Sequence, residues 1–264
     1  MTKVEFDSNR INQAARGWLR EVAAALGYLL RLPRGAELHP DEIDNARARR
    51  FFPLAALAIA FAGAVAFFVC RFIGLPSIAA ALFATFVMML TTGLRAEVML
   101  AAFAEGIAAG VDPASRRAAM AEQRFGYYGV AALLFAVLLK IVLWSMAGGS
   151  WAGMAFIFAA APAAAAALAM LTDMFMAADD ERLGGLALPE GRALAWLAPL
   201  LAFVFLLLFL GFWGAILAAL MGAATAYAVG RYCRDELGGL TMPGLAAALL
   251  ATELAVLAAA VIAR

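Results

Sequence analysis

Two glutamates, Glu97 and Glu105, follow an apolar stretch and are eight positions apart. If this segment is helical, their side chains lie roughly 80° apart around the helix axis. Two carboxylates placed in this way could share a cleft and act on one ligand, or could simply solvate a helix that leaves an apolar layer. Arg95 adds a cation two residues before Glu97. The residues alone leave both interpretations open.

Lys140 and Glu253 are unusual because each lies inside an otherwise apolar run. A charge held at the centre of a bilayer costs roughly 2.5–3.5 kcal/mol and implies a partner. Lys140 is only a few residues from the end of its run, so we expect its long side chain to reach the interface, with a buried partner as the alternative. For Glu253, nearer the middle of the last run, we expect a buried hydrogen bond.

The other polar candidates have simpler interpretations. Glu122 and Arg124 could contact a phosphate group or be ordinary loop charges. We expect the single histidine, His39, to be solvated in a polar linker, and Asp173 to mark the end of an apolar segment. The acidic run at 179–181 is expected to be a solvated loop, with a substrate contact as the alternative.

The segments that must position these groups are strongly apolar. Of the 264 residues, 66% are hydrophobic and only 15% are charged, whereas a soluble domain is typically about 45–50% apolar and about 25% charged. A bilayer core needs about 20 mostly apolar residues per helix. The sequence therefore predicts an all-α polytopic membrane helix bundle. Its candidate spans are 52–73, 76–94, 127–147, 151–176, 193–210, 212–230 and 244–263.

The fifth and sixth candidate spans meet at Gly211 with almost no loop. They predict either a tight hairpin or one long broken helix, so the number of spans is six or seven. The run of small residues Ala161–Ala169 favours close packing between helices in lipid. Two distant cysteines, Cys70 and Cys233, indicate neither a disulfide framework nor a zinc site.

Basic residues set the expected orientation. Lys and Arg gather in 1–50, 95–126, 179–192 and 231–243, which all fall on one side if there are seven spans. Such residues mark the cytoplasmic side of a membrane, so we expect a multi-pass protein with a cytoplasmic N-terminus. No segment combines basic charge with exposed aromatics, and nucleic-acid binding is therefore not expected.

The segment from about Arg16 to Leu32 mixes Trp and Leu with Arg and Glu. It is too short and too charged to span a bilayer, so we predict an amphipathic helix lying on the cytoplasmic interface. The chain thus divides into an N-terminal cytoplasmic segment, 1–50, and a single transmembrane domain, 51–264. The sequence leaves a homo-oligomer open.

Several elements, in order along the chain, resemble one family of membrane enzymes. LGYLLRLP at 26–33 and RFFPL at 50–54 are similar to the opening of the cobalamin-5′-phosphate synthases, also called adenosylcobinamide-GDP ribazoletransferases. MAEQRFGYYG at 120–129 resembles the family's M-x-D-S-R-x-G-x-x-G element. Lys140 stands where the family carries a lysine, and GGLT at 238–241 resembles the start of its late G-G-x-T-G-D element.

The resemblance implies a specific reaction. Family members transfer the adenosylcobinamide phosphate moiety from adenosylcobinamide-GDP to α-ribazole or its phosphate and release GMP, with Mg²⁺, at the cytoplasmic face. By this resemblance Arg95, Glu97 and Glu105 are expected to be catalytic, with Glu97 and Glu105 also binding the metal ion. The substrate-binding residues that it implies are Glu122, Arg124, Gly126, Gly129, Lys140, Gly239 and Thr241.

The acidic element of this chain departs from that pattern. The family reads approximately G-x-H-x-D-G-x-A-D-x-x-D-G, whereas residues 92–106 read TGLRAEVMLAAFAEG, and Pro243 replaces the late aspartate. Three hypotheses follow: a transferase with a divergent metal site, a catalytically impaired member that binds corrinoid or lipid, or an unrelated transporter or scaffold. The concentration of charge at one face, rather than along a path through the bilayer, argues against the third.

Overall fold

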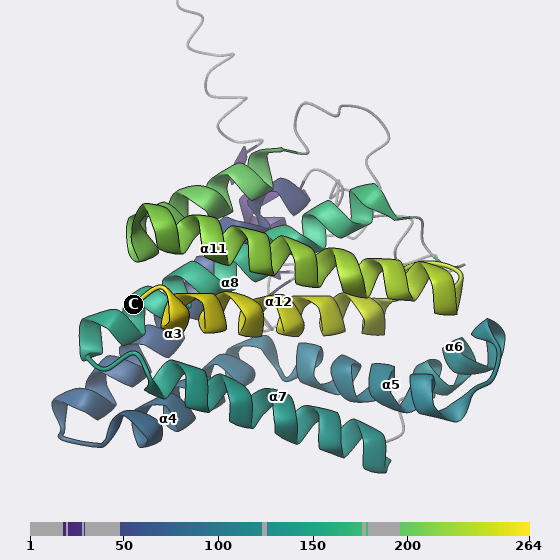
Figure 1. The fold of residues 1–264 in the computed structure, drawn as a ribbon, viewed down its shortest axis with the longest axis horizontal. Coiled ribbons are helices and arrows are strands. Elements are labelled where there is room, and N and C mark those ends of the chain that lie inside the picture. The colour runs from purple at the N-terminus through teal and green to yellow at the C-terminus, as the bar shows by residue number, and fades with distance from the viewer. Residues whose placement is uncertain are drawn as a thin grey trace, which may run out of the picture.

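The computed structural model shows a bundle of helices (Figure 1) and describes residues 18–19, 21–27, 29, 48–122, 126–175, 178 and 196–264. These residues form helices and no strand, which confirms the predicted all-α membrane bundle. The elements are η2 (Arg49–Phe51), α3 (Phe52–Phe72), α4 (Ser77–Thr92), α5 (Arg95–Ala109), α6 (Pro113–Ala121), α7 (Tyr127–Ser145), α8 (Ser150–Met174), α11 (Leu197–Leu237) and α12 (Met242–Ile262).

Five helices of the described part are long and apolar enough to cross a membrane, beginning at η2–α3 and continuing with α7, α8, α11 and α12. A sixth span results if α4 and α5 count as one broken span, because they meet at a bend of 89°. The predicted second span, 76–94, thus corresponds to α4, which has 16 residues and ends at the bend.

Helix α11 contains the fifth and sixth predicted spans and reverses direction at Gly211, whose φ of 71° and ψ of −178° are not helical. Before the break, Phe209 stacks on Phe158 of α8. After the break, Tyr227 lies against Phe175, at the other end of α8. Because the chain travels away along α8 and returns, the tight hairpin is the correct alternative, as Figure 1 shows.

Helix α8 lies at the centre of the bundle. Of an 18-residue apolar stretch in this helix, 72% is buried inside the protein, against 22–50% for the equivalent stretches of the other four long helices of the described part. It packs against α3, α11 and α12. The alanines of Ala161–Ala169 provide this contact surface, since those at 161, 164–167 and 169 are buried. The predicted close packing through small residues is confirmed.

The N-terminal residues that the structure describes, within 18–29, are helical. Ala25 is fully buried against the bundle, whereas Trp18 and Leu19 are exposed. Arg50 forms an ion pair with Glu21 and so joins this helix to the start of the first span. An amphipathic helix packed beside the bundle agrees with the predicted interfacial helix. The domain boundary at residue 50 and the cytoplasmic side remain predictions.

Candidate functional site

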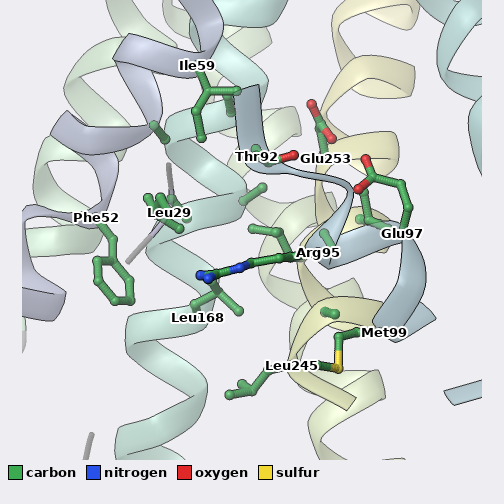
Figure 2. Close-up of a pocket in the computed structure, with 18 of the residues that line it drawn as sticks. Leu29, Phe52, Ile59, Thr92, Arg95, Glu97, Met99, Leu168, Leu245 and Glu253 are labelled. Carbon is green, nitrogen blue, oxygen red and sulfur yellow. The ribbon is translucent and has the colours of Figure 1, made fainter. Parts of the chain in front are cut away.

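A cavity of about 420 Å³ runs into the bundle between α3, α5, α8 and α12 (Figure 2). Its outer part is lined by Phe52, Thr172 and Met242, which lie at the ends of three helices. Its inner part reaches Lys140 and Glu253. Glu253 lies 11 residues into α12, or about 16 Å along the helix axis. The cavity therefore connects one end of the bundle with buried charges near its middle.

Apolar side chains form most of the wall, and a few polar groups gather at one side. The apolar residues include Phe52, Ile59, Met88, Leu168, Leu245 and Leu249. The polar and charged ones are Thr92, Arg95, Glu97, Lys140, Thr172 and Glu253. A concave apolar site with a small number of placed polar groups is typical of a small-molecule pocket.

The break between α4 and α5 brings two predicted catalytic residues, Arg95 and Glu97, to this cavity. Gly93 and Leu94 both have positive φ, 65° and 57°, and this conformation is uncommon and strained for leucine. The resulting bend starts α5 beside the cavity. Figure 2 shows the Arg95 side chain extending across the cavity toward Phe52, while Glu97 lies on the side of Glu253.

Lys140 and Glu253 form an ion pair inside the bundle. The Lys140 Nζ lies 2.8 Å from Glu253 Oε1, and both side chains are only 8% exposed. The expectation that Lys140 reaches the interface is therefore wrong, because α12 supplies a carboxylate at the same depth. The alternative of a buried partner is correct, and the expected buried role of Glu253 is confirmed.

Glu97 completes a cluster with this pair. It is 7% exposed, and its Oε2 is buried without a hydrogen-bond partner in the described structure. It lies close enough for the Lys140 ammonium to attract it and for the Glu253 carboxylate to repel it. A buried carboxylate oxygen without a donor is costly, so such groups usually have an additional partner.

Glu105 lies in a different place. Its Oε1 accepts a hydrogen bond of 2.7 Å from the backbone N–H of Gly129, at the start of α7. It is eight positions from Glu97 along α5, which corresponds to about 12 Å along the helix axis. Unlike Glu97, it is not among the residues that line the cavity. The structure therefore does not bring the two predicted metal ligands together.

Gly126 and Gly129 allow α7 to approach α5 closely. A Cβ atom on Gly126 would lie 2.5 Å from Glu105 Oε1, and one on Gly129 would lie 2.8 Å from the Ala101 carbonyl oxygen. Both glycines thus have a packing role that accounts for their size. Their predicted contact with substrate stays a prediction.

Two other predicted binding residues lie in the connection between α11 and α12. Thr241 caps α12 by accepting a hydrogen bond of 3.1 Å from the backbone N–H of Gly244, a stabilising arrangement at a helix start. Gly239 precedes it with a φ of 156°. The structure does not place either residue on the cavity wall.

Helix α6 is joined by two arginines to the end of α11, directly before this connection. Arg116 pairs with Glu236, and this pairing raises the pKa of the Arg116 guanidinium. Arg117 donates to the Leu237 carbonyl oxygen over 2.5 Å. Glu122 ends α6. Arg124, His39 and the acidic run at 179–181 lie outside the described residues.

Sequence reasoning missed the role of Arg49, which it counted only as a marker of orientation. Arg49 is 2% exposed, and it donates to Thr172 Oγ1 over 2.5 Å and pairs with Asp173 Oδ1 at 2.7 Å. It thereby joins the start of the first span to the end of α8, beside the cavity wall at Thr172. No sequence pattern predicts a contact between two residues, Arg49 and Asp173, that are 124 positions apart in the chain.

The donor set suits a metal ion only in part. The described residues contain no group of three or more His, Cys, Asp or Glu side chains placed to hold one. Mg²⁺ typically takes one or two protein carboxylates and completes its shell with water and substrate phosphates. Glu97, whose Oε2 has no hydrogen-bond partner within the described part of the chain, fits one such ligand, whereas Glu253 is engaged with Lys140.

Comparisons with known proteins agree with the resemblance. Residues 21–261 match the family model for cobalamin-5-phosphate synthase. An adenosylcobinamide-GDP ribazoletransferase of Ralstonia nicotianae is 33% identical over 257 residues, 92% of this chain and 95% of that protein. One of Ralstonia pickettii is 32% identical, with 88% and 91% covered. No solved structure matches significantly. The chain belongs to the cobalamin-5-phosphate synthase family.

Proposed function

We propose that this protein transfers the adenosylcobinamide phosphate moiety of adenosylcobinamide-GDP to α-ribazole or its phosphate and releases GMP. The observation that carries the proposal is the match to ribazoletransferases along nearly the whole length of both chains. In this reaction a hydroxyl oxygen of the acceptor forms a bond to the phosphorus that carries cobinamide. The bond from that phosphorus to GMP breaks.

The cavity offers the groups that such a transfer needs. Phosphoryl transfer depends on positioning and on cations that offset charge on the phosphoryl oxygens. Arg95 provides a cation that extends across the cavity. Glu97 provides a buried carboxylate oxygen without a hydrogen-bond partner in the described structure, which can accept the proton of an attacking hydroxyl. Lys140 and Glu253 neutralise each other as a pair at the inner end of the cavity.

We include Mg²⁺ in the proposal through Glu97. When bound, the ion would neutralise phosphate charge, and Glu97 would hold it through one carboxylate oxygen while the other accepts from the attacking hydroxyl. The expected second ligand, Glu105, is instead hydrogen-bonded to Gly129. Localisation in a bacterial inner membrane, with the N-terminus in the cytoplasm, and a homo-oligomeric state are likewise proposals.

The test is GMP release by the full chain reconstituted in liposomes with adenosylcobinamide-GDP, α-ribazole and Mg²⁺. We expect release above a protein-free blank and a large loss in Glu97→Gln. No release by the wild-type protein, together with measurable corrinoid binding, would instead indicate a catalytically impaired member. Turnover at the wild-type rate in Glu97→Gln would show that the cavity is not the reaction site.

Glu105→Gln is the matched variant, because it makes the same chemical change on the same helix but away from the cavity. A hydrogen bond from Gly129 can still be accepted by the glutamine side-chain oxygen. A loss of turnover restricted to Glu97→Gln would place the chemistry at the cavity. Equal losses would favour a metal site that includes both residues.

A further inference from the structure

We propose that the cavity is the subsite for the acceptor, an aromatic base linked to ribose, and that the corrinoid donor stays outside it. Within this subsite the base packs among the apolar side chains, and a ribose hydroxyl donates to Glu97. The proposal rests on the proposed function, because it assigns one of the two substrates of that reaction to a defined part of the molecule.

Size separates the two substrates. Small-molecule pockets usually enclose about 300–1,000 Å³, and this cavity, at about 420 Å³, lies near the lower end. A base with one ribose is a molecule of this class. The donor carries a complete corrin ring with its side chains and a guanosine diphosphate, so it is far larger. Only the part of the donor around its diphosphate can approach the cavity.

The walls match an aromatic base. Phe52, Ile59 and Leu168 line the cavity, together with Met88 and Leu245. Figure 2 shows Phe52 and Leu168 on the side that the Arg95 side chain approaches. A flat apolar ring buries its surface among such side chains, and the polar side chains are then left for the ribose.

Glu97 supplies a polar contact on a cavity wall that is otherwise mostly apolar. Its Oε2 is buried and has no hydrogen-bond partner among the residues that the structure describes, which leaves one strong acceptor available at the cavity. The other carboxylate at this depth, Glu253, is engaged with Lys140. A hydroxyl that enters the cavity therefore finds its acceptor at Glu97. The Glu97 carboxylate thereby positions the hydroxyl oxygen for attack and accepts its proton.

The donor's diphosphate then meets Arg95 at the outer part of the cavity. Arg95 is an exposed residue that also lines the cavity. Its guanidinium can bind phosphate oxygens with paired hydrogen bonds. The acceptor oxygen forms the new bond to phosphorus, the bond to GMP breaks, and GMP leaves toward the open side. The hydroxyl proton passes to Glu97.

Binding of α-ribazole alone tests the assignment without requiring turnover. The full chain in lipid nanodiscs is titrated with labelled α-ribazole, in the absence of donor and of Mg²⁺. Ala164→Leu and Ala246→Leu enlarge buried wall residues on α8 and α12, respectively. Ala223→Leu makes the same change on the exposed surface of α11. Glu97→Gln removes the charge with almost no change of shape.

We expect both filling variants to weaken α-ribazole binding at least about tenfold, and Glu97→Gln to weaken it about tenfold as well. Ala223→Leu should bind as the wild type does. In the GMP-release assay, a filling variant should raise the KM for α-ribazole and leave the KM for adenosylcobinamide-GDP within about twofold. Thermal unfolding of each variant shows whether it is folded, and Glu97→Gln avoids any steric effect.

Unchanged α-ribazole affinity in all three cavity variants would overturn the assignment while leaving the transferase proposal intact. Loss of a copurified lipid in the filling variants, with unchanged α-ribazole affinity, would overturn it in favour of a lipid site. A raised KM for the corrinoid alone would place the donor inside the cavity. Absence of GMP release by the wild type would contradict the proposed function, even if α-ribazole binds.

Discussion

Removing the buried cation Lys140 should destabilise the protein more than removing its partner Glu253. Lys140→Met leaves two carboxylates, Glu97 and Glu253, facing each other in the bundle without a cation between them. Breaking a buried ion pair by deleting one partner typically costs about 3–5 kcal/mol, and we expect Lys140→Met to fall in this range. Both side chains are 8% exposed, so water screens the remaining charges little.

Glu253→Gln should cost less, about 1–3 kcal/mol. The glutamine oxygen can still accept from the Lys140 ammonium, and Glu97 remains close enough to attract it. The hydrogen bond that glutamine keeps and methionine loses already favours this order, and the repulsion between Glu97 and Glu253 increases the difference.

The free energy of unfolding can be measured by titrating the purified protein from mild micelles into SDS. The double variant Lys140→Met/Glu253→Gln should be more stable than Lys140→Met alone, because it removes the repulsion between two carboxylates. Leu138→Met, an exposed change on the same helix, should lie within about 0.5 kcal/mol of the wild type. An equal or larger cost for Glu253→Gln, or no recovery in the double variant, would refute the reasoning.

Three further predictions concern the backbone. Gly211→Ala should cost about 1–3 kcal/mol in the same titration, since a φ of 71° with a ψ of −178° is essentially restricted to glycine. The control is Gly149→Ala, which should be nearly neutral because Gly149 has an extended φ of −160° and open space around it. Gly129→Ala should cost about 1–3 kcal/mol by forcing α7 away from a carbonyl oxygen of α5, and crosslinking between the two helices should weaken. The pKa of Asp112 is lowered, chiefly because the backbone N–H of Ser115 donates to its carboxylate. The ionised carboxylate should therefore stabilise α6 above the ordinary pKa of an aspartate, and this stabilisation should be lost as the pH falls through the lowered value. Hydrogen exchange of α6 measures the effect, and it should show no such pH dependence in Asp112→Asn.

The sequence was sufficient for the architecture because apolar run length is a strong and local signal. Runs of about 20 apolar residues leave few alternatives to membrane helices, and the hairpin at Gly211 was one of two alternatives that the short connection allowed. The 89° bend between α4 and α5 was not predicted. It depends on Leu94 adopting a positive φ, which no residue preference would suggest.

The site was predicted less completely, because its contacts join distant parts of the chain. Arg95 and Glu97 were selected from a motif and do line the cavity. The Lys140 partner could not be chosen from periodicity, since Glu253 lies on a helix 113 residues away. Whether two charges on separate helices lie at the same level of the bundle is determined only when the helices pack together. The contact between Arg49 and Asp173 was missed for the same reason.

The segment at 92–106 carries fewer acidic residues than the family pattern, and the positions of the carboxylates in the structure help to explain this difference. Glu105 is engaged with the backbone of α7, and Glu253 is engaged with Lys140, so both contribute to holding helices together. Glu97 alone keeps a buried oxygen without a hydrogen-bond partner within the described structure. The cavity wall contains two cations, Arg95 and Lys140, and two carboxylates, Glu97 and Glu253, so these charges balance in number inside a membrane, where unbalanced charge is costly. The number of carboxylates in the motif is therefore a weaker guide to activity than the position of the one that faces the cavity.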